Sequence, residues 1–416
     1  AQESSILAQA ASDGTVSSMT MNFWRAPAAT LLLITAQQQW ASALRVQRVD
    51  RDIDRALKCL RLTTPDLQLT YPSDAEQHVE EIYNAMLPWT PNYTSAKKWS
   101  FHVEDMWMTD IRGLWKNMSG RASLSAMFGP YVPIFAHWVA PWAGLKYRPF
   151  KSMHYPEEML SALRSVLRKD VPYVTVSKSC TGLLGWGELP YSDFPNMLVL
   201  SAGGYGHAAL PLHQTDGGSD QKARIRSIHF LSHQALRRPI AARKHFVSYV
   251  GKWTSGHGRV RPLMVQALND FVRAHGNNTD LVKVFYGEGW EDVMLHSKFS
   301  LVPRGAGRTA YHLVETIQMG LIPIHIYDDI PWVPYPEVYK EFGFQTDMKG
   351  LPQLLERLFA MPDVEVEALE SQVAKYAHSH FKPIPEELQI VSFLSGQGKS
   401  DIMCMPLPKS SGVQPD

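Results

Sequence analysis

The residues best suited to chemistry lie between Lys298 and Tyr335, in the sequence KFSLVPRGAGRTAYHLVETIQMGLIPIHIYDDIPWVPY. This pattern predicts a short strand, a glycine-containing loop, an amphipathic helix, a second strand and an acidic, proline-rich turn. The start of a helix has unpaired N–H groups and a favourable dipole, so such a unit can bind a phosphate. Gly305 and Gly307 allow close approach of the backbone to a ligand. Arg304 and Arg308 add cationic donors suited to phosphate.

A polar face of the predicted helix fits a nucleotide. If the helix opens near Arg308, then Arg308, His312 and Glu315 stand at i, i+4 and i+7 and share one face. A cation in the first turn would meet a diphosphate, and a carboxylate two turns later would accept ribose hydroxyls. An ordinary surface helix with an Arg/Glu pair shows the same spacing, so the helix alone does not specify a ligand.

Several motifs together resemble one family. The run SKFSLVPRG, Glu315 ten residues after Gly305, the run QMGLIPIHIYDD and the PW-V-PY turn resemble the exostosin-like glycosyltransferases, glycosyltransferase family 47. Upstream, HFVSYVGKW followed by Arg259 and Arg261 resembles the strand and arginine of that family. PYVTVS and NMLVLSAGGYGHAALPL resemble the end of its N-terminal half. The resemblance spans about 171–344.

The resemblance implies an α/β fold of the GT-B type, with two Rossmann-like lobes facing a central cleft. It implies inverting transfer of a sugar from a nucleotide donor, usually a UDP-sugar, to a glycan acceptor. No metal or other cofactor would be required, and homo- or heterodimers are compatible with it. Arg261 would meet the diphosphate, Glu315 would bind the ribose, and the turn Pro303-Arg304-Gly305 would line the nucleotide site. Arg259 is expected to belong to the same nucleotide-sugar site.

The chain also departs from the family pattern. Ala310 and His312 stand where many exostosin-like sequences have Ser and Arg, and the pair Arg308-Thr309 would supply a cation and a hydroxyl from one turn earlier. A non-catalytic glycan- or nucleotide-binding member therefore stays as the alternative. Asp329, after the strand that ends the motif, fits either a donor-sugar contact or an ordinary strand-end turn.

Inverting transfer needs a base that deprotonates the acceptor hydroxyl. The titratable candidates in the N-terminal half are Glu188, Asp193, His207 and Asp216. We select His207 because it ends the glycine loop GGYG, although a histidine that hydrogen-bonds the loop would occupy the same position. The chain shows no HExxH, GxGxxG, GxSxG or GxxxxGK[ST] motif, which disfavours metalloprotease, oxidoreductase, hydrolase and P-loop functions.

Composition narrows the partners and the compartment. Lys plus Arg (41) nearly equals Asp plus Glu (40), so nothing favours binding to nucleic acid. Sequons at Asn92, Asn117 and Asn277 would accept glycans if the chain enters the secretory pathway. With the resemblance they favour the Golgi lumen, through a signal anchor upstream of this chain, over a soluble cytosolic protein. The cysteines, at positions 59, 180 and 404, allow either one bridge and a free thiol or no bridge.

The elements expected to carry the site form two lobes. Residues 1–66 are a stem or a helix packed on the N-terminal lobe, 67–243 form that acceptor-side lobe, 244–394 form the nucleotide-sugar lobe, and 395–416 are a disordered tail. In the first lobe the pattern predicts helices 75–87 and 156–169 and strands 171–177 and 197–201. In the second it predicts strand 245–250, helix 260–274, strand 282–286, helix 290–297, strand 298–302, helix 308–319, strand 321–327 and helices 348–361 and 364–380. The resemblance implies that the last helix crosses back to the first lobe.

Overall fold

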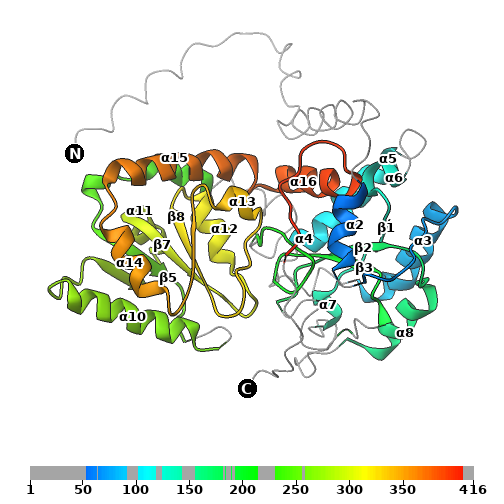
Figure 1. Cartoon of the computed structure of the whole chain (residues 1–416), viewed down its shortest axis with the longest axis horizontal. Helices are drawn as coiled ribbons and strands as arrows, with labels where there is room; N and C mark the ends of the chain where they lie inside the picture. The colour runs from blue at the N-terminus through cyan, green and yellow to red at the C-terminus, as the bar shows by residue number, and fades with distance from the viewer. Residues whose placement is uncertain are drawn as a thin grey trace, which may run out of the picture. The chain divides into compact units, whose positions relative to one another are not determined.

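The computed structural model describes residues 53–62, 64–90, 102–118, 124–142, 155–180, 183, 189, 193–213, 230–254 and 258–405. These residues form two α/β lobes, each built on a parallel sheet, so the predicted fold class is confirmed (Figure 1). Within this part of the chain, no helix combines the length and apolar character needed to cross a bilayer. The predicted stem, 1–66, lies outside the described residues except for its last part.

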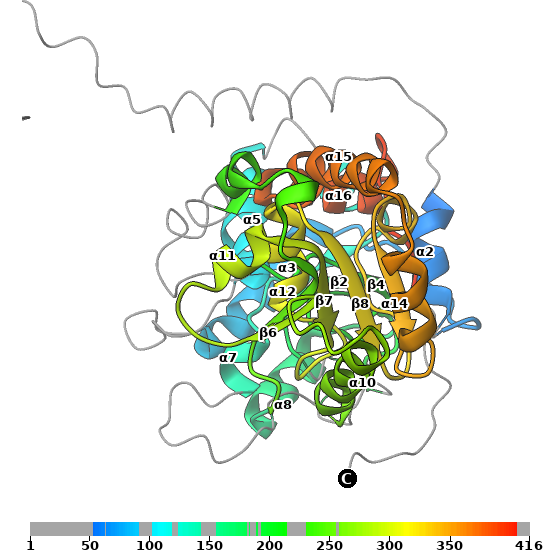
Figure 2. The same cartoon turned by 90° about the vertical axis from the view of Figure 1, so that its left-hand side faces the viewer.

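The C-terminal lobe is built on the five-stranded sheet β6-β5-β7-β8-β9. Its strands pair in parallel throughout, and the three central strands, β5, β7 and β8, are mostly buried, as expected for strands covered on both faces. Helices α10 and α14 pack together on one face, and α12 and α15 on the other (Figures 1 and 2). The bounds are β5 His245–Val250, α10 Val260–Ala274, β6 Val282–Phe285, α11 Trp290–Leu295, β7 Ser297–Pro303, α12 Tyr311–Gln318, β8 Ile322–Tyr327, α13 Pro336–Tyr339, β9 Phe344–Asp347, α14 Leu351–Phe359 and α15 Asp363–Ser379.

The N-terminal lobe is built on the four-stranded parallel sheet β1-β2-β3-β4. Every residue of β2 and β3 is buried, and the two strands pair over five residues. The bounds are α2 Ile53–Arg61, α3 Ala75–Met86, α4 His102–Asp105, α5 Arg112–Met118, α6 Leu124–Phe128, β1 Val132–Pro133, α7 Val139–Trp142, α8 Glu157–Val166, β2 Tyr173–Ser177, β3 Met197–Ser201 and β4 Ala208–Ala209. Short 3-10 turns lie at η1 Leu87–Trp89, η4 His233–Leu236 and η5 Ile240–Ala242, and a π-helical stretch, η2 Met106–Ile111, joins α4 directly to α5.

The end of the chain returns to the N-terminal lobe. Helix α15 packs on α12 and β8 and stays in the C-terminal lobe, whereas the next helix, α16 (Pro383–Ser395), packs on α6 and α2. The predicted crossing thus occurs one helix later than expected. The C-terminal lobe accordingly ends before Pro383, the first residue of α16, and not at 394. Helix α2 packs on α16 and β3, in agreement with a packing helix at the end of 1–66.

The predicted disordered tail is wrong for residues 396–405. Ile402 is fully buried, and the N–H of Met405 donates to the carbonyl of His207 at 2.8 Å. Cys404 forms an antiparallel bridge with Ala208 and a disulfide with Cys59, 345 residues earlier. Composition indicated a polar tail, but these anchors give the segment defined contacts; residues 406–416 lie outside the described part.

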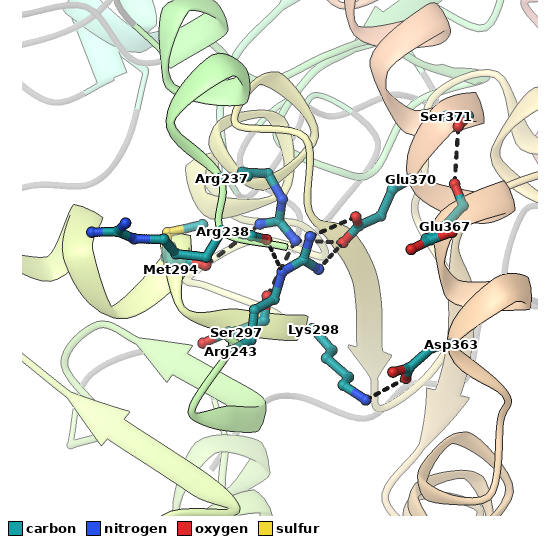
Figure 3. Close-up of polar contacts among 10 residues, drawn as sticks. All are labelled: Arg237, Arg238, Arg243, Met294, Ser297, Lys298, Asp363, Glu367, Glu370 and Ser371. Atoms are coloured by element: carbon teal, nitrogen blue, oxygen red, sulfur yellow. Dashed lines mark hydrogen bonds and ion pairs between the residues drawn. The ribbon is translucent and has the colours of Figure 1, made fainter. Parts of the chain in front are cut away.

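The segment that enters the C-terminal lobe is fixed by a buried ion cluster. Arg237 and Arg243 both donate to the carboxylate of Glu370 on α15, and Arg237 also donates to the carbonyl of Ser297 at 3.1 Å (Figure 3). Their side chains are largely buried, and burial lowers the pKa of Arg237 to about 10 despite the attraction of Glu370. This cluster lies at the amino ends of β5 and β7, at the edge opposite the site described next.

Candidate functional site

A cavity of about 910 Å³ lies between the two lobes. Its wall comes from residues at the carboxyl ends of parallel strands in both sheets, which is where open α/β sheets bind ligands. Lys178 follows β2, Gly251 follows β5, and Gly305 follows β7. The volume is that of a small-molecule site.

The C-terminal wall carries a fixed arginine. The Arg261 guanidinium donates from Nε to the carbonyl of Arg304 at 3.2 Å and from Nη1 to the carbonyl of Lys252 at 2.9 Å. Backbone acceptors thus hold this cation at the cavity wall, and a Cβ placed on Gly305 would lie 3.7 Å from its Nη2. Pro303 and Gly305, which the resemblance assigns to the nucleotide site together with Arg261, line the same wall.

The start of α12 faces the cavity. The helix begins at Tyr311, three residues later than predicted, because Ala310 is extended (φ −143°, ψ 152°). Thr309, His312 and Glu315, which the sequence analysis assigns to nucleotide-sugar binding, line the cavity. His312 Nε2 lies 3.0 Å from the Ser300 hydroxyl, and its Nδ1 lies 3.6 Å from a Glu315 oxygen. These three residues thus lie in the cavity wall, although the helix starts later than the sequence predicted.

Arg304 and Arg308 do not line the cavity, which corrects their predicted place in the nucleotide site. Both are buried, at 3% exposed. Arg304 pairs with Asp328, and Arg308 donates to Asp329 from Nε at 2.7 Å. The late start of α12 explains the difference for Arg308, because this residue lies in the preceding loop and not on the polar face of the helix.

The remaining two predicted nucleotide contacts are also elsewhere. Asp329 accepts from Arg308 and from the N–H of Ile330 at 2.7 Å. Burial would raise the pKa of Asp329, but these hydrogen bonds and the nearby arginines lower it. Arg259 is an exposed residue at the N-cap of α10 and is not part of the wall.

The N-terminal wall contains residues that the sequence analysis missed. Lys178 and Ser179 line the cavity directly after β2. The backbone N–H of Lys178 donates to the carboxylate of Glu104 at 2.9 Å, and the other oxygen of Glu104 accepts from the N–H groups of Trp138 and Val139. Glu104 is fully buried, and burial raises its pKa. The signal was available, since PYVTVS was recognised as a buried strand and ligands bind beyond such strands.

Aromatic side chains form a further part of the wall that the sequence analysis missed. Tyr249 is the penultimate residue of β5, and Tyr286 and Trp290 flank the loop after β6. Tyr286 is 65% exposed, which leaves its ring accessible from the cavity. Such faces suit a nucleobase or a sugar ring. Only the position of Tyr286 at the carboxyl end of the predicted strand 282–286 could have indicated it.

His207 is placed differently from the predicted catalytic base. Its side chain is fully buried and does not line the cavity. The Val199 N–H donates to its Nδ1 at 2.9 Å, and burial lowers the pKa of His207 to about 3. This is a neutral histidine that supports the loop after β3, and the position offers no route to an acceptor hydroxyl in the cavity. Burial likewise lowers the pKa values of His213 and His325 to about 4.

The other sequence candidates are settled only in part. Asp193 accepts from Arg164 at 2.8 Å, and Glu188 and Asp216 lie outside the described residues. Asn117 and Asn277 are exposed, as glycan acceptors must be, whereas Asn92 lies outside the described part. Cys180, which is not part of the disulfide, lines the cavity. Across the described segments, no group of three or more His, Cys, Asp or Glu side chains is arranged to hold a metal ion.

Fold and site together define a two-lobed α/β protein with a ligand-sized cavity between its lobes. No protein-family model matches the chain, and no curated protein matches its sequence. Among solved structures it is similar to the crystal structure of WaaG, a glycosyltransferase involved in lipopolysaccharide biosynthesis, with a TM-score of 0.31 and 10% identity over 79% of this chain and 98% of that chain. A superposition at this level does not bear on the activity of this chain.

Proposed function

We propose that this protein is a glycosyltransferase that binds a nucleotide sugar, a UDP-sugar, in the interlobe cavity and transfers the sugar to a glycan acceptor with inversion. The observation that carries the proposal is the composition of the C-terminal wall. Arg261, the start of α12 and Glu315 meet there, so one surface combines donors for a diphosphate with an acceptor for ribose hydroxyls.

We assign the donor nucleotide to the C-terminal wall of the cavity and the acceptor to the N-terminal wall. The donor would lie along the C-terminal wall, with its base near Tyr286 and Trp290 and its diphosphate between Arg261 and the start of α12. Lys178 and Ser179 on the N-terminal wall would then face the transferred sugar and the acceptor. Lys178 Nζ lies 5.4 Å from the centre of the Tyr311 ring, which keeps its charge beside the first turn of α12.

In the proposed reaction an acceptor oxygen forms a bond to the anomeric carbon. The bond from that carbon to the phosphate oxygen breaks, and the nucleotide diphosphate leaves with the electron pair. Arg261 and the N–H groups of α12 would stabilise the negative charge that develops on it. Among the described cavity residues, the acceptors that could take the proton are Glu288, His312 and Glu315, all from the C-terminal lobe. We assign none of them as the base.

The proposed compartment is the Golgi lumen. The disulfide between Cys59 and Cys404 supports an oxidising compartment, and exposed Asn117 and Asn277 are compatible with glycan attachment there. We also propose that a signal anchor lies upstream of this chain and that transfer does not require a metal ion. Dimer formation is part of the same proposal.

A second function, binding of a nucleotide or glycan without transfer, is favoured by one observation. Two of the arginines expected to contact the donor are paired with Asp328 and Asp329, so the cavity keeps fewer cations for a leaving diphosphate than the sequence suggested. Such a protein would bind UDP or glycan and release no UDP from a UDP-sugar.

Calorimetric titration with UDP separates these functions. We expect the wild-type chain to bind UDP and Glu315→Ala to bind about 10- to 100-fold more weakly, because a hydrogen bond to a charged group contributes about 1.5–3 kcal/mol. Glu365→Ala, at an exposed site on α15, is the matched control and should bind as the wild type does. Release of UDP from a UDP-sugar in the presence of glycan would then support transfer. Folded protein that binds no UDP would contradict transfer from a UDP-sugar, and folded protein that binds neither UDP nor glycan would contradict both functions.

A further inference from the structure

The loop after β3 and the loop after β7 touch through their backbones at one side of the cavity. The N–H of Arg308 donates to the carbonyl of Gly203 at 3.2 Å. A Cβ on Gly307 would lie 2.0 Å from that same carbonyl oxygen, so the two loops meet where no side chain fits. Gly203 and Gly307 both line the cavity, so this contact lies in its wall.

Side chains reinforce the contact. The Arg308 guanidinium lies 3.9 Å from the centre of the Tyr205 ring, and Arg304 donates from Nη2 to the Tyr205 hydroxyl at 3.3 Å. Tyr205 adopts a left-handed backbone conformation with φ +60°, which is uncommon for a residue other than glycine. A single tyrosine of the N-terminal lobe therefore contacts both arginines of the C-terminal loop, and its unusual backbone conformation orients it toward them.

The two arginines are already neutralised by their own lobe. Asp328 and Asp329, after β8, pair with Arg304 and Arg308 respectively. Burial lowers the pKa of Arg304, but the hydrogen bond to Asp328 and the negative charge of Asp328 together raise it above its usual value. A diphosphate at either guanidinium would have to displace a carboxylate and lie beside it. These charges suit a structural role better than contact with an anionic ligand.

We propose that Tyr205, Arg304, Arg308, Asp328 and Asp329 form an interlobe clasp, which sets the separation of the two cavity walls. They are positioning residues: the clasp holds Gly203 against Gly307, and thereby fixes the distance between Lys178 on one wall and Arg261 on the other. The indole N–H of Trp332 donates to the carbonyl of Ser201 at 3.3 Å beside it and supports the same join. Only the catalytic consequence of the clasp rests on the proposed function.

The separation of the lobes can be measured without any ligand. Spin labels at two exposed positions, Glu158→Cys on α8 and Asn269→Cys on α10, report the distance between the lobes. A Cys180→Ser background leaves the disulfide intact and removes the one cysteine outside it, so that only the introduced cysteines are labelled. We expect one narrow distance distribution from this protein. Arg308→Met, which keeps an apolar chain but removes the ion pair and the ring contact, should broaden the distribution and move its mean.

A matched variant separates the clasp from the donor site. Arg261→Met removes a cation from the wall outside the clasp, so it should leave the distance distribution unchanged and weaken UDP binding about 10- to 100-fold. Asp329→Asn is the second clasp variant, for use if Arg308→Met does not fold, and should broaden the distribution in the same direction. If UDP-sugar turnover is present, the clasp variants should lower kcat more than they raise KM.

Either of two results would overturn the clasp. An unchanged distance distribution in Arg308→Met, with a large loss of UDP affinity, would make Arg308 a phosphate ligand. An unchanged distribution with unchanged affinity would show that the contact does not set the separation. A chain that binds no UDP, yet whose distribution broadens in both clasp variants, would retain the clasp and contradict the proposed function.

Discussion

The bond between Cys59 and Cys404 makes a strong prediction about stability. It closes a loop over a sequence separation of 345 residues, which nearly encloses the described chain. The chain-entropy relation for a loop of this length gives about 6 kcal/mol at 25 °C, an upper value because cross-links commonly deliver about 2–4 kcal/mol. Cys59 is fully buried where α2 packs on α16, so loss of the bond also weakens the attachment of both segments.

The perturbation is Cys59→Ser with Cys404→Ser in a Cys180→Ser background, so that no free thiol can exchange with the bridge. Urea unfolding of the double variant should give a free energy of unfolding at least about 2 kcal/mol below that of the Cys180→Ser parent. Treatment of the parent with reductant should reproduce the loss, and reductant should leave the double variant unchanged.

Two results would refute this reasoning. Titration of thiols in the unfolded, unreduced wild-type chain should find one thiol, from Cys180; finding three would mean that the bridge is absent. Equal urea midpoints for parent and double variant, with the bridge shown to be present, would mean that the closed loop does not limit the unfolded ensemble.

Three further predictions concern buried ionisable side chains. Glu370→Ala should lower the free energy of unfolding by about 3–5 kcal/mol in urea titration, because it leaves two buried arginines without their carboxylate (Figure 3), whereas exposed Glu367→Ala should change it little. Glu104→Ala should cost about 3 kcal/mol by the same measurement, since three buried N–H groups lose their acceptor; an unchanged midpoint would contradict this role. Burial lowers the pKa values of His207, His213 and His325, so these histidines are protonated below about pH 6.5 in the unfolded state but only near pH 3–4 in the folded state. As the pH drops through this window, the free energy of unfolding should therefore fall by about 1.4 kcal/mol per pH unit for each of the three histidines. His207→Asn should show a shallower pH dependence of the urea midpoint, and an identical slope would contradict the assignment.

The C-terminal lobe was predictable because its elements follow local rules. The strand 245–250 and the helix 260–274 have the predicted bounds, since an apolar run and a helical period each identify one element. Positions in the site that follow from strand ends, such as Gly305, were also found. Arg261, on the first turn of α10, and Glu315, on the polar face of α12, followed from the resemblance and the helical period.

What the sequence did not reveal depends on contacts between distant residues. The start of α12 was misplaced because Arg308 is bound to Gly203, and no local pattern contains that contact. The charge on Arg304 suggested an anionic ligand, but its carboxylate partner stands 24 residues away, on the next strand end. His207 was chosen for its place beside a glycine loop, yet burial is a property of the packed sheet.

The return of α16 and residues 396–405 to the N-terminal lobe has a consequence for folding during synthesis. Both ends of the described chain complete one lobe, and the C-terminal lobe, β5 to α15, is an unbroken insertion within it. During synthesis, the N-terminal lobe therefore cannot be completed until α16 and residues 396–405 have left the ribosome. The later lobe can close on its own before α16 appears. Nascent chains halted after Ser379 should accordingly protect β5 to α15 from protease and leave β2 and β3 open to cleavage; the reverse pattern would contradict this order.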